Sequence, residues 1–230
     1  MKYPIALILP LTLAVGFAKN EPDKRIRESA AVLNEVMNAP DKGIPQDLME
    51  RAQCVGVVPN LKRAGFIVGA KYGRGVVVCR ANDRAGWSAP SNIRIEGGSI
   101  GFQIGAGETD VVFLVMNERG MNRLMEDKFT VGGDASVMAG PVGRSAQAQT
   151  DAMMHAEILS YSRSRGVFAG ISLEGATLRP DSDENAILYG PGVTQRQILH
   201  GEVRTPEVAQ PLYSELNRFP AKGSADRSRP

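Results

Sequence analysis

The sequence has little charge imbalance, few aromatic residues and few metal-binding side chains, and each shortage excludes a class of protein. Its 27 basic and 25 acidic residues leave a formal net charge of +2, so bulk electrostatics gives no support for nucleic-acid binding. Aromatic residues make up 6% of the chain, against 25 glycines in 230 residues, which favours small-residue strands and tight turns over a helical bundle. The two cysteines have no histidine cluster near them, so we expect no metal and no cofactor.

Long hydrophobic runs are also scarce, and the one that is present lies at the N-terminus. A lysine, an apolar stretch over about residues 3–17, and the small pair Gly16 and Ala18 follow the pattern of a secretory signal. The stretch is shorter than the roughly 20 apolar residues of a spanning helix, and Pro10 interrupts it, although an uncleaved anchor is the alternative. We therefore expect a signal peptide over 1–18, with no lipid-attachment cysteine, and export to the periplasm or cell envelope.

The two cysteines, Cys54 and Cys79, each sit in an apolar, strand-like run, "CVGVV" and "GVVVC". In an oxidising compartment, cysteines on neighbouring strands form a disulfide when their Cα atoms come within about 7 Å. A pair of buried free thiols acting as small hydrophobic side chains is the alternative. Because the chain carries an export signal, the sequence favours the disulfide.

After the signal, the chain predicts a helix over residues 24–37. Its apolar positions recur at helical spacing and are Ile26, Ala30, Leu33 and Met37. Lys24, Arg25 and Arg27 crowd its start, where they oppose the helix dipole. Two interpretations remain: a helix that lies on a membrane surface, and, more commonly in proteins, a helix packed on the domain with its charged side in solvent.

From Cys54 onwards, short apolar runs broken by glycine predict strands, with "KYGRG" (71–75) as the best hairpin turn. A helix is expected over 118–128, further strands after it, and a C-terminal helix that begins near Pro206. The fold class expected is α+β: a curled antiparallel, glycine-rich sheet, barrel-like or sandwich-like, with flanking N- and C-terminal helices. We expect a single domain over 19–220 and a polar tail over 221–230.

The stretch "YSRSRGVFAGISLEG", Tyr161 to Gly175, predicts a β-hairpin. If Arg165 and Gly166 form the loop, Arg163 lies opposite Phe168 and Tyr161 lies opposite Gly170. One face then carries an arginine beside two aromatic rings. This arrangement suits either an anion-binding site or simply a stable hairpin.

Basic residues recur in the predicted turns. They are Lys62, Arg63, Lys71, Arg74, Arg163 and Arg165. Several turns at one end of a sheet would together present a cationic rim to phosphate groups, which arginine holds in bidentate fashion. The alternative is that these charges are there only because turns are solvated.

One motif points to an enzyme. "GGSIG" fits the G-x-S-x-G pattern of a hydrolase nucleophile elbow, with Ser99 as the nucleophile. That elbow needs a sharp turn from a strand into a helix, whereas the glycines that follow break helices. The two histidines, His155 and His200, have no acidic neighbours to orient a catalytic base. We therefore expect no enzyme, and a Ser99 hydrolase is only a distant alternative.

Five motifs in order identify a resemblance: "GWSAPS", "GGSIGFQIG", "TDVVFLVMN", "GGDASVMAGPVGR" and "SYSRSRGVFAGISLEGA". Over about residues 44–178 the chain resembles the SYLF domain family, lipid-binding modules that are also labelled as an actin-binding domain. The resemblance implies phosphoinositide binding and work beside actin regulators for eukaryotic relatives, which often carry an SH3 or FYVE module. It implies no catalytic residues and no metal. With its export signal, this chain is most similar to the stand-alone bacterial branch.

The function expected is therefore non-enzymatic binding of anionic phospholipid at the bacterial cell envelope, through the basic turn residues and the 24–37 helix. Phosphatidylglycerol or cardiolipin would be the available lipids, and actin is an unlikely partner for an exported protein. The alternative is a soluble periplasmic structural or protein-interaction domain.

Overall fold

The computed structural model describes residues 21–39, 43–65, 68–81, 86–100, 105–142, 156–164 and 167–220. The predicted signal peptide and polar tail lie outside these residues. The helices, including one 3₁₀ turn (η3), are α1 (Glu21–Met37), α2 (Gln46–Arg51), α3 (Glu118–Leu124), α5 (Ser182–Tyr189), α6 (Gln195–Leu199), η3 (Glu207–Ala209) and α7 (Gln210–Leu216). No helix within the described ranges has the length and apolar composition that crossing a bilayer requires.

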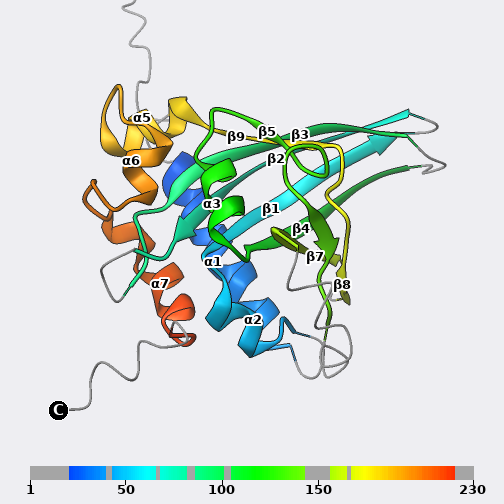
Figure 1. The fold of residues 1–230 in the computed structure, drawn as a ribbon, viewed down its shortest axis with the longest axis horizontal. Coiled ribbons are helices and arrows are strands. Elements are labelled where there is room, and N and C mark those ends of the chain that lie inside the picture. The colour runs from blue at the N-terminus through cyan, green and yellow to red at the C-terminus, as the bar shows by residue number, and fades with distance from the viewer. Residues whose placement is uncertain are drawn as a thin grey trace, which may run out of the picture.

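The strands are β1 (Cys54–Gly65), β2 (Val68–Cys79), β3 (Ser91–Ile100), β4 (Gly105–Val115), β5 (Phe129–Thr130), β6 (Val137–Ala139), β7 (Ile158–Ser164), β8 (Val167–Gly170) and β9 (Ala176–Pro180). They form one curled sheet in the order β5-β9-β3-β2-β1-β4-β7-β6, and β8 also pairs with β7 (Figure 1). All pairs of these strands are antiparallel except β6 with β7. The predicted α+β class with helices near both chain ends is confirmed, and the one parallel pair makes the sheet mixed.

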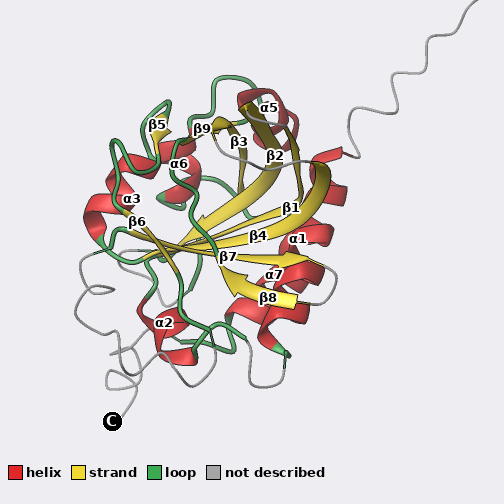
Figure 2. Ribbon diagram, turned by 90° about the vertical axis from the view of Figure 1, so that its right-hand side faces the viewer, coloured by secondary structure: helices red, strands yellow, loops and turns green. Residues whose placement is uncertain are grey.

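The sheet buries residues on both faces. On the helix face, Val57, Val76 and Val112 pack with Leu33 of α1 and Leu212 of α7 in one core. Figure 2 shows α1 and α7 on one side of β1 and β4, with α3 on the other. Because successive side chains of a strand point to opposite faces, a single strand feeds both cores.

The inner face, inside the curl, carries a second core. Val58, Val77 and Phe113 of the central strands pack there with Leu124 of α3 and Phe129 of β5. Strands buried on both faces read as near-continuous apolar runs. This explains the apolar runs "CVGVV" and "VVFLV".

The predicted hairpin turn at 71–75 is wrong, because these residues lie inside β2. Its glycines instead allow close packing against β1. A Cβ on Gly73 would lie 2.7 Å from the Leu61 side chain, and one on Gly75 would lie 2.1 Å from the carbonyl oxygen of Val57. Glycine in a strand interior marks such a close approach. The sequence signal was therefore real, but its cause is the packing of β2 on β1 and not a reversal of the chain.

The segment "PNLKRAG", Pro59 to Gly65, contains Lys62 and Arg63, which were predicted to lie in a turn, and it too is strand. It continues β1 after an irregularity in register between Val57 and Lys62. Asn60 sits in this irregularity with a φ of 52°, a left-handed conformation that asparagine tolerates better than most residues. β1 ends at Gly65 and its antiparallel partner β2 begins at Val68; residues 66–67 lie outside the described residues.

Candidate functional site

The central strands have two contrasting ends. We call the end that starts β1 and finishes β2 the base, and we call residues 61–65, 68–72, 96–100 and 105–109 the strand tips. In Figure 1 the strand tips extend to the right, away from α5, α6 and α7. Of the six basic residues predicted to bind lipid, those that the structure describes differ in their position relative to these tips.

Arg63 and Lys71 come together at the strand tips. They are directly opposite one another on β1 and β2. Lys71 in turn faces Gly97 of β3, and Arg63 faces Gly107 of β4. Residues paired across strands share a face of the sheet, and the alternation of side chains places this row on the inner face. Two long cationic side chains thus stand side by side with a glycine on either flank.

Arg63 has no acidic partner among the described residues. It is half-buried, and its Nε is enclosed without a hydrogen-bond acceptor. Burial lowers the pKa of this arginine, which is the expected response of a cation that loses water without gaining a carboxylate. A buried charge normally has a partner, so Arg63 is the least compensated cation of the strands.

Lys71 is only partly compensated. Its Nζ donates a hydrogen bond of 3.1 Å to the backbone carbonyl of Glu174. Burial lowers the pKa of Lys71, the neighbouring Arg63 lowers it further, and the Glu174 carboxylate acts in the opposite direction. Like charges directly opposite on a sheet destabilise the pair. The inner face of the strand tips therefore holds an excess of positive charge.

Lys62 points to the other face of the sheet. Its side chain is 72% exposed and its Nζ lies 3.9 Å from Oε1 of Glu108. An exposed pair of this kind contributes little to stability. Tyr72, the residue opposite Lys62, is also exposed. The strand tips thus present a lysine and a tyrosine on the helix face and two cations on the inner face.

Arg74 lies deeper in the fold and is held by carboxylates. Its Nη1 is 2.9 Å from Oε1 of Glu184 and its Nε is 3.3 Å from Oδ2 of Asp181. Burial alone would lower the pKa of Arg74, but the Tyr72 hydroxyl and these two carboxylates raise it. Desolvation is also the main cause of the raised pKa of Asp181. Arg74 therefore serves an internal ion-pair network.

Arg163 is likewise engaged. Its Nε and Nη2 donate to Oδ2 of Asp110 at 3.0 and 2.8 Å, and it forms an ion pair with Glu35 of α1. A polar cleft of about 320 Å³ beside it is also lined by Glu108. Three carboxylates against one arginine make this cleft unfavourable for an anion.

The hairpin that carries Arg163 has the predicted register. Tyr161 pairs with Gly170 and Arg163 pairs with Phe168, so that prediction is confirmed; Arg165 lies outside the described residues. Tyr161 is fully buried and its ring stacks on Phe168 with centroids 5.4 Å apart. A Cβ on Gly140 would overlap the Tyr161 ring. The aromatic side of the hairpin therefore serves the core.

The first helix is packed on the domain. Ile26, Leu33 and Val36 are buried. Arg25 donates to both carboxylate oxygens of Glu184, at 2.9 and 2.8 Å. This confirms the packed interpretation of α1, because a membrane-bound helix would have to leave both its core and a buried ion pair.

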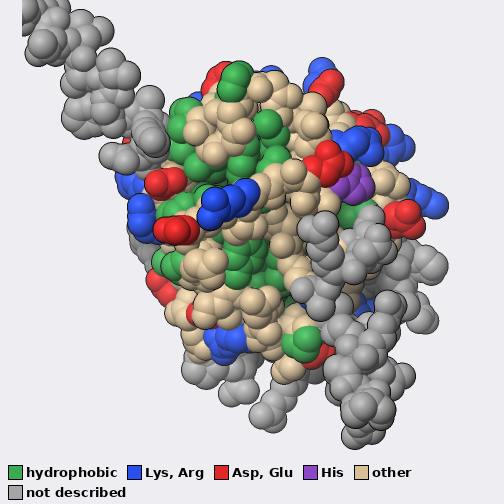
Figure 3. Space-filling model, turned by 90° about the vertical axis from the view of Figure 1, so that its left-hand side faces the viewer, with side chains coloured by type: hydrophobic (Ala, Val, Ile, Leu, Met, Phe, Trp, Pro, Cys, Tyr) green, Lys and Arg blue, Asp and Glu red, His purple; other side chains and the backbone are tan. Residues whose placement is uncertain are grey.

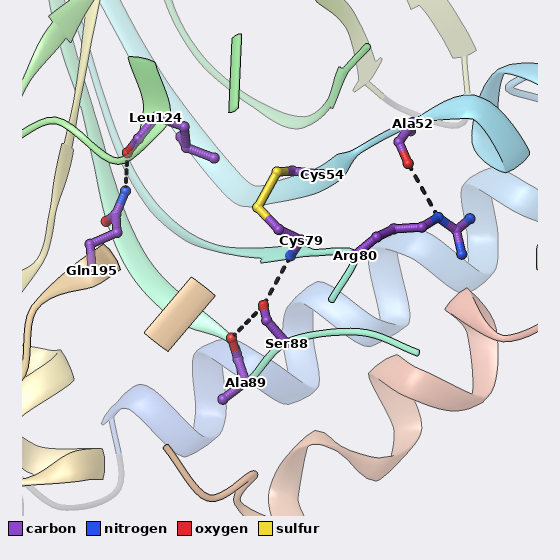
Figure 4. Close-up of a disulfide and its surroundings, with 8 residues drawn as sticks. All are labelled: Ala52, Cys54, Cys79, Arg80, Ser88, Ala89, Leu124 and Gln195. Atoms are coloured by element: carbon purple, nitrogen blue, oxygen red, sulfur yellow. Dashed lines mark hydrogen bonds between the residues drawn. A yellow bond between two sulfur atoms is a disulfide. The ribbon is translucent and has the colours of Figure 1, made fainter. Parts of the chain in front are cut away.

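At the base, Cys54 and Cys79 lie opposite one another and a disulfide joins them (Figure 4). Arg80, the next residue, donates to the backbone carbonyls of Ala52 at 3.3 Å and of Phe219 at 2.8 Å. Its guanidinium stacks over Trp87, 4.1 Å from the ring centroid. The base thus ties the sheet to α2 and to the C-terminal segment.

The hydrolase elbow has no support in this fold. Ser99 lies within β3, opposite Gly69 of β2, and not at a turn from a strand into a helix. His155 lies outside the described residues, and His200 is exposed at the end of α6. Among the described residues no group of three or more histidine, cysteine or acidic side chains could hold a metal ion.

Comparison with known proteins identifies relatives. The family model described as "Ysc84: Las17-binding protein actin regulator" matches residues 96–219. "LAS seventeen-binding protein 3" of Saccharomyces cerevisiae is 37% identical over 203 residues, which is 86% of this chain and 44% of that protein. "SH3 domain-containing YSC84-like protein 1" of Mus musculus is 36% identical over 207 residues, which is 90% of this chain and 60% of that protein. The chain thus spans about half the length of these curated relatives.

Proposed function

Since the chain belongs to the Ysc84, or SYLF, family, we propose that it is a non-enzymatic module that binds anionic phospholipid surfaces through its strand tips. The observation that carries the proposal is the pair Arg63 and Lys71, two neighbouring cations without full compensation at the open end of the sheet. Lys62 adds an exposed charge on the other face of the same tips. Anionic membrane surfaces attract basic clusters by about 1 kcal/mol per lysine or arginine.

The composition of the segments that join these strands also favours membrane binding through the strand tips. The residues that join β1 to β2 are Phe66 and Ile67, and those that join β3 to β4 include Phe102 and Ile104. Their placement lies outside the described residues. Apolar residues close in sequence to basic ones are a composition that suits a membrane interface, where apolar groups enter and cations meet phosphates.

The proposal keeps three of the six predicted basic residues and excludes two, while Arg165 lies outside the described residues. Arg74 and Arg163 already have carboxylate partners, and a cation paired in this way gains little from a phosphate. Lys62, Arg63 and Lys71 remain as binding residues. Export to the cell envelope belongs to the proposal as well, with phosphatidylglycerol or cardiolipin as the lipid, and it depends on the signal-like N-terminus.

Vesicle flotation tests the proposal. The protein should float with phosphatidylglycerol vesicles, lose that association as salt increases, and stay behind with phosphatidylcholine vesicles. Exchanging both Arg63 and Lys71 for glutamate should abolish flotation. The matched control is Arg196→Glu, an exposed arginine of α6 at the other end of the molecule. Equal loss in both variants, or no flotation of the natural chain, would refute the proposal.

A protein-binding role is the second candidate. It is favoured by the names of the relatives, which refer to Las17 binding, and by the family description, which includes the words "actin regulator". The expectation that actin is an unlikely partner rests on export alone and has no support from these relatives. Co-sedimentation with actin filaments, with and without vesicles, separates this candidate from lipid binding.

A further inference from the structure

We infer that Arg63 and Lys71 form a discrete site for a single phosphate group on the inner face of the strand tips. This inference rests on the proposed function in placing binding at the tips, but it differs in kind. A diffuse cationic surface is indifferent to which lysine or arginine supplies the charge, whereas a site depends on two particular side chains.

Glycines form the floor around the two cations. The positions beside them in the same row are Gly97 and Gly107. A Cβ on Gly107 would meet nothing within 4 Å, whereas one on Gly97 would lie 2.8 Å from the Gly175 carbonyl oxygen. The row is therefore open on the β4 side and closed on the β9 side. Such a shape leaves room for a small group next to the cations.

The row nearer the tip extends this floor. Two residues further along each strand, Gly65 of β1 faces both Gly69 of β2 and Gly105 of β4. With glycine at all three positions, β1, β2 and β4 place no side chain in this row; the residue opposite Gly69 on β3 is Ser99. The glycines of β1, β2 and β4 thus leave space near the two cations.

Arg63 differs from the other strand arginines in its charge compensation. Five arginines lie in the described strands, and four of them have a carboxylate within ion-pair distance: Arg74, Arg94, Arg163 and Arg179. Arg63 is the fifth, and it has none among the described residues. Among the acidic neighbours, Glu96 and Glu108 stand beside Tyr72 and Lys62 on the helix face. The Glu174 carboxylate raises the pKa of Lys71 but has no such effect on Arg63. The fold therefore pairs its strand arginines consistently and leaves this one unpaired next to a lysine.

A phosphate group matches this arrangement. An arginine presents a planar fork of donors to two phosphate oxygens, and a lysine adds a point charge. Placed between the two side chains, a phosphate would offset their repulsion and give the Arg63 guanidinium the acceptor that it lacks. The phosphate of a lipid headgroup and that of a soluble phosphate ester offer the same chemistry. The experiment must therefore show which of the two compounds binds.

The test is a titration of the isotope-labelled full chain with inorganic phosphate and with glycerol phosphate, followed by NMR. The expected result is saturable shifts of amides around residues 63 and 71, with one phosphate bound per chain. Arg63→Gln and Lys71→Gln should each weaken binding by about tenfold, the effect of losing one charge-assisted hydrogen bond. The matched control is Arg196→Gln, at an exposed arginine of α6 at the other end of the molecule, which should change affinity by less than about twofold.

A steric variant keeps the inference falsifiable if a charge variant fails to fold. Gly107→Leu retains both cations and fills the open side of the row. It should weaken phosphate binding while its flotation with phosphatidylglycerol vesicles at low salt persists. Phosphate affinity equal to that of the natural chain would overturn the site.

The outcomes separate the site from the proposed function. Saturable phosphate binding, together with flotation that Arg63→Gln weakens far more than Lys62→Gln does, supports a headgroup site. Saturable phosphate binding without any flotation supports the site with a soluble phosphate ester and refutes the membrane role. Flotation without saturable phosphate binding, equally reduced by Arg63→Gln and Lys62→Gln, overturns the site and leaves the membrane role in place.

Discussion

The base and the tips are the two ends of the same hydrogen-bonded strands, but they carry different kinds of side chain. At the base, Cys54, Val77 and Val115 are buried between helices and the curled sheet. At the tips, the same three strands carry several glycines and alanines, the cations of β1 and β2, and Glu108 of β4. One set of strands thus supplies stability at one end and an exposed binding surface at the other, so substitutions at the two ends should affect different measurements.

The surface of the helical end strengthens this contrast. Figure 3 looks at the left-hand side of Figure 1, the side of α5 and α6, and shows hydrophobic, acidic and basic side chains mixed on that face. Acidic residues there hold cations within the fold, as Glu184 holds Arg25 and Arg74. An anion has little reason to choose this end, whereas the tips keep unpaired positive charge.

The largest effect should come from opening the base. Reducing the disulfide between Cys54 and Cys79, which closes a loop with a sequence separation of 25, should lower the free energy of unfolding by about 3.5 kcal/mol in the chain-entropy model. Chemical denaturation with and without reductant measures this difference. Vesicle flotation of the reduced but folded protein should be unchanged, since the cations lie at the other end. Two free thiols in the unreduced, alkylated protein would contradict the bridge.

The next effect compares one substitution at both ends. A Cβ on Gly56, at the base, would lie 2.0 Å from the Phe113 ring, so Gly56→Ala should cost about 3 kcal/mol through overpacking. Gly107→Ala, at the tips, meets open space and should stabilise by about 0.5 kcal/mol by restricting the unfolded chain. Thermal denaturation of the two variants checks both values. Similar losses at both positions would mean that the tips are packed like the base.

The smallest stability effect should come from the cations themselves. Arg63→Gln removes one of two adjacent like charges and no ion pair, so the free energy of unfolding should change by less than about 0.5 kcal/mol. Denaturation in phosphate-free buffer is the measurement, because a bound phosphate would stabilise the natural chain alone. A loss of several kcal/mol would show that Arg63 supports the fold.

Features with a local cause were predictable from the sequence. The helix over 21–37 follows from the spacing of Ile26 and Leu33, and the register of the 161–170 hairpin follows from its alternation. Both signals involve residues close in sequence, so no other part of the chain had to be known. The family was also identified, because its motifs are short and ordered.

Two helices were missed: α6, which buries Ile198 and Leu199 but has only five residues, too few to display a helical period, and α5, whose packing is polar. The buried residues of α5 are Glu184 and Asn185. The Asn185 amide oxygen accepts from the backbone N–H of Asn92 at 2.7 Å, and its amide nitrogen donates to the Asn92 carbonyl at 3.1 Å. A helix held by such contacts has no apolar stripe for the sequence to display.

The sequence by itself determined the class of fold, the family and the set of basic residues, because composition and short-range periodicity carry that information. Only the tertiary structure decided which cations are free. Arg74 and Arg163 meet carboxylates more than 50 residues away in the chain, whereas Arg63 lies opposite Lys71 on the neighbouring strand. Both Arg63 and Lys71 were predicted to lie in turns. The charge on a side chain is local, but its compensation depends on neighbours that long-range folding brings to it.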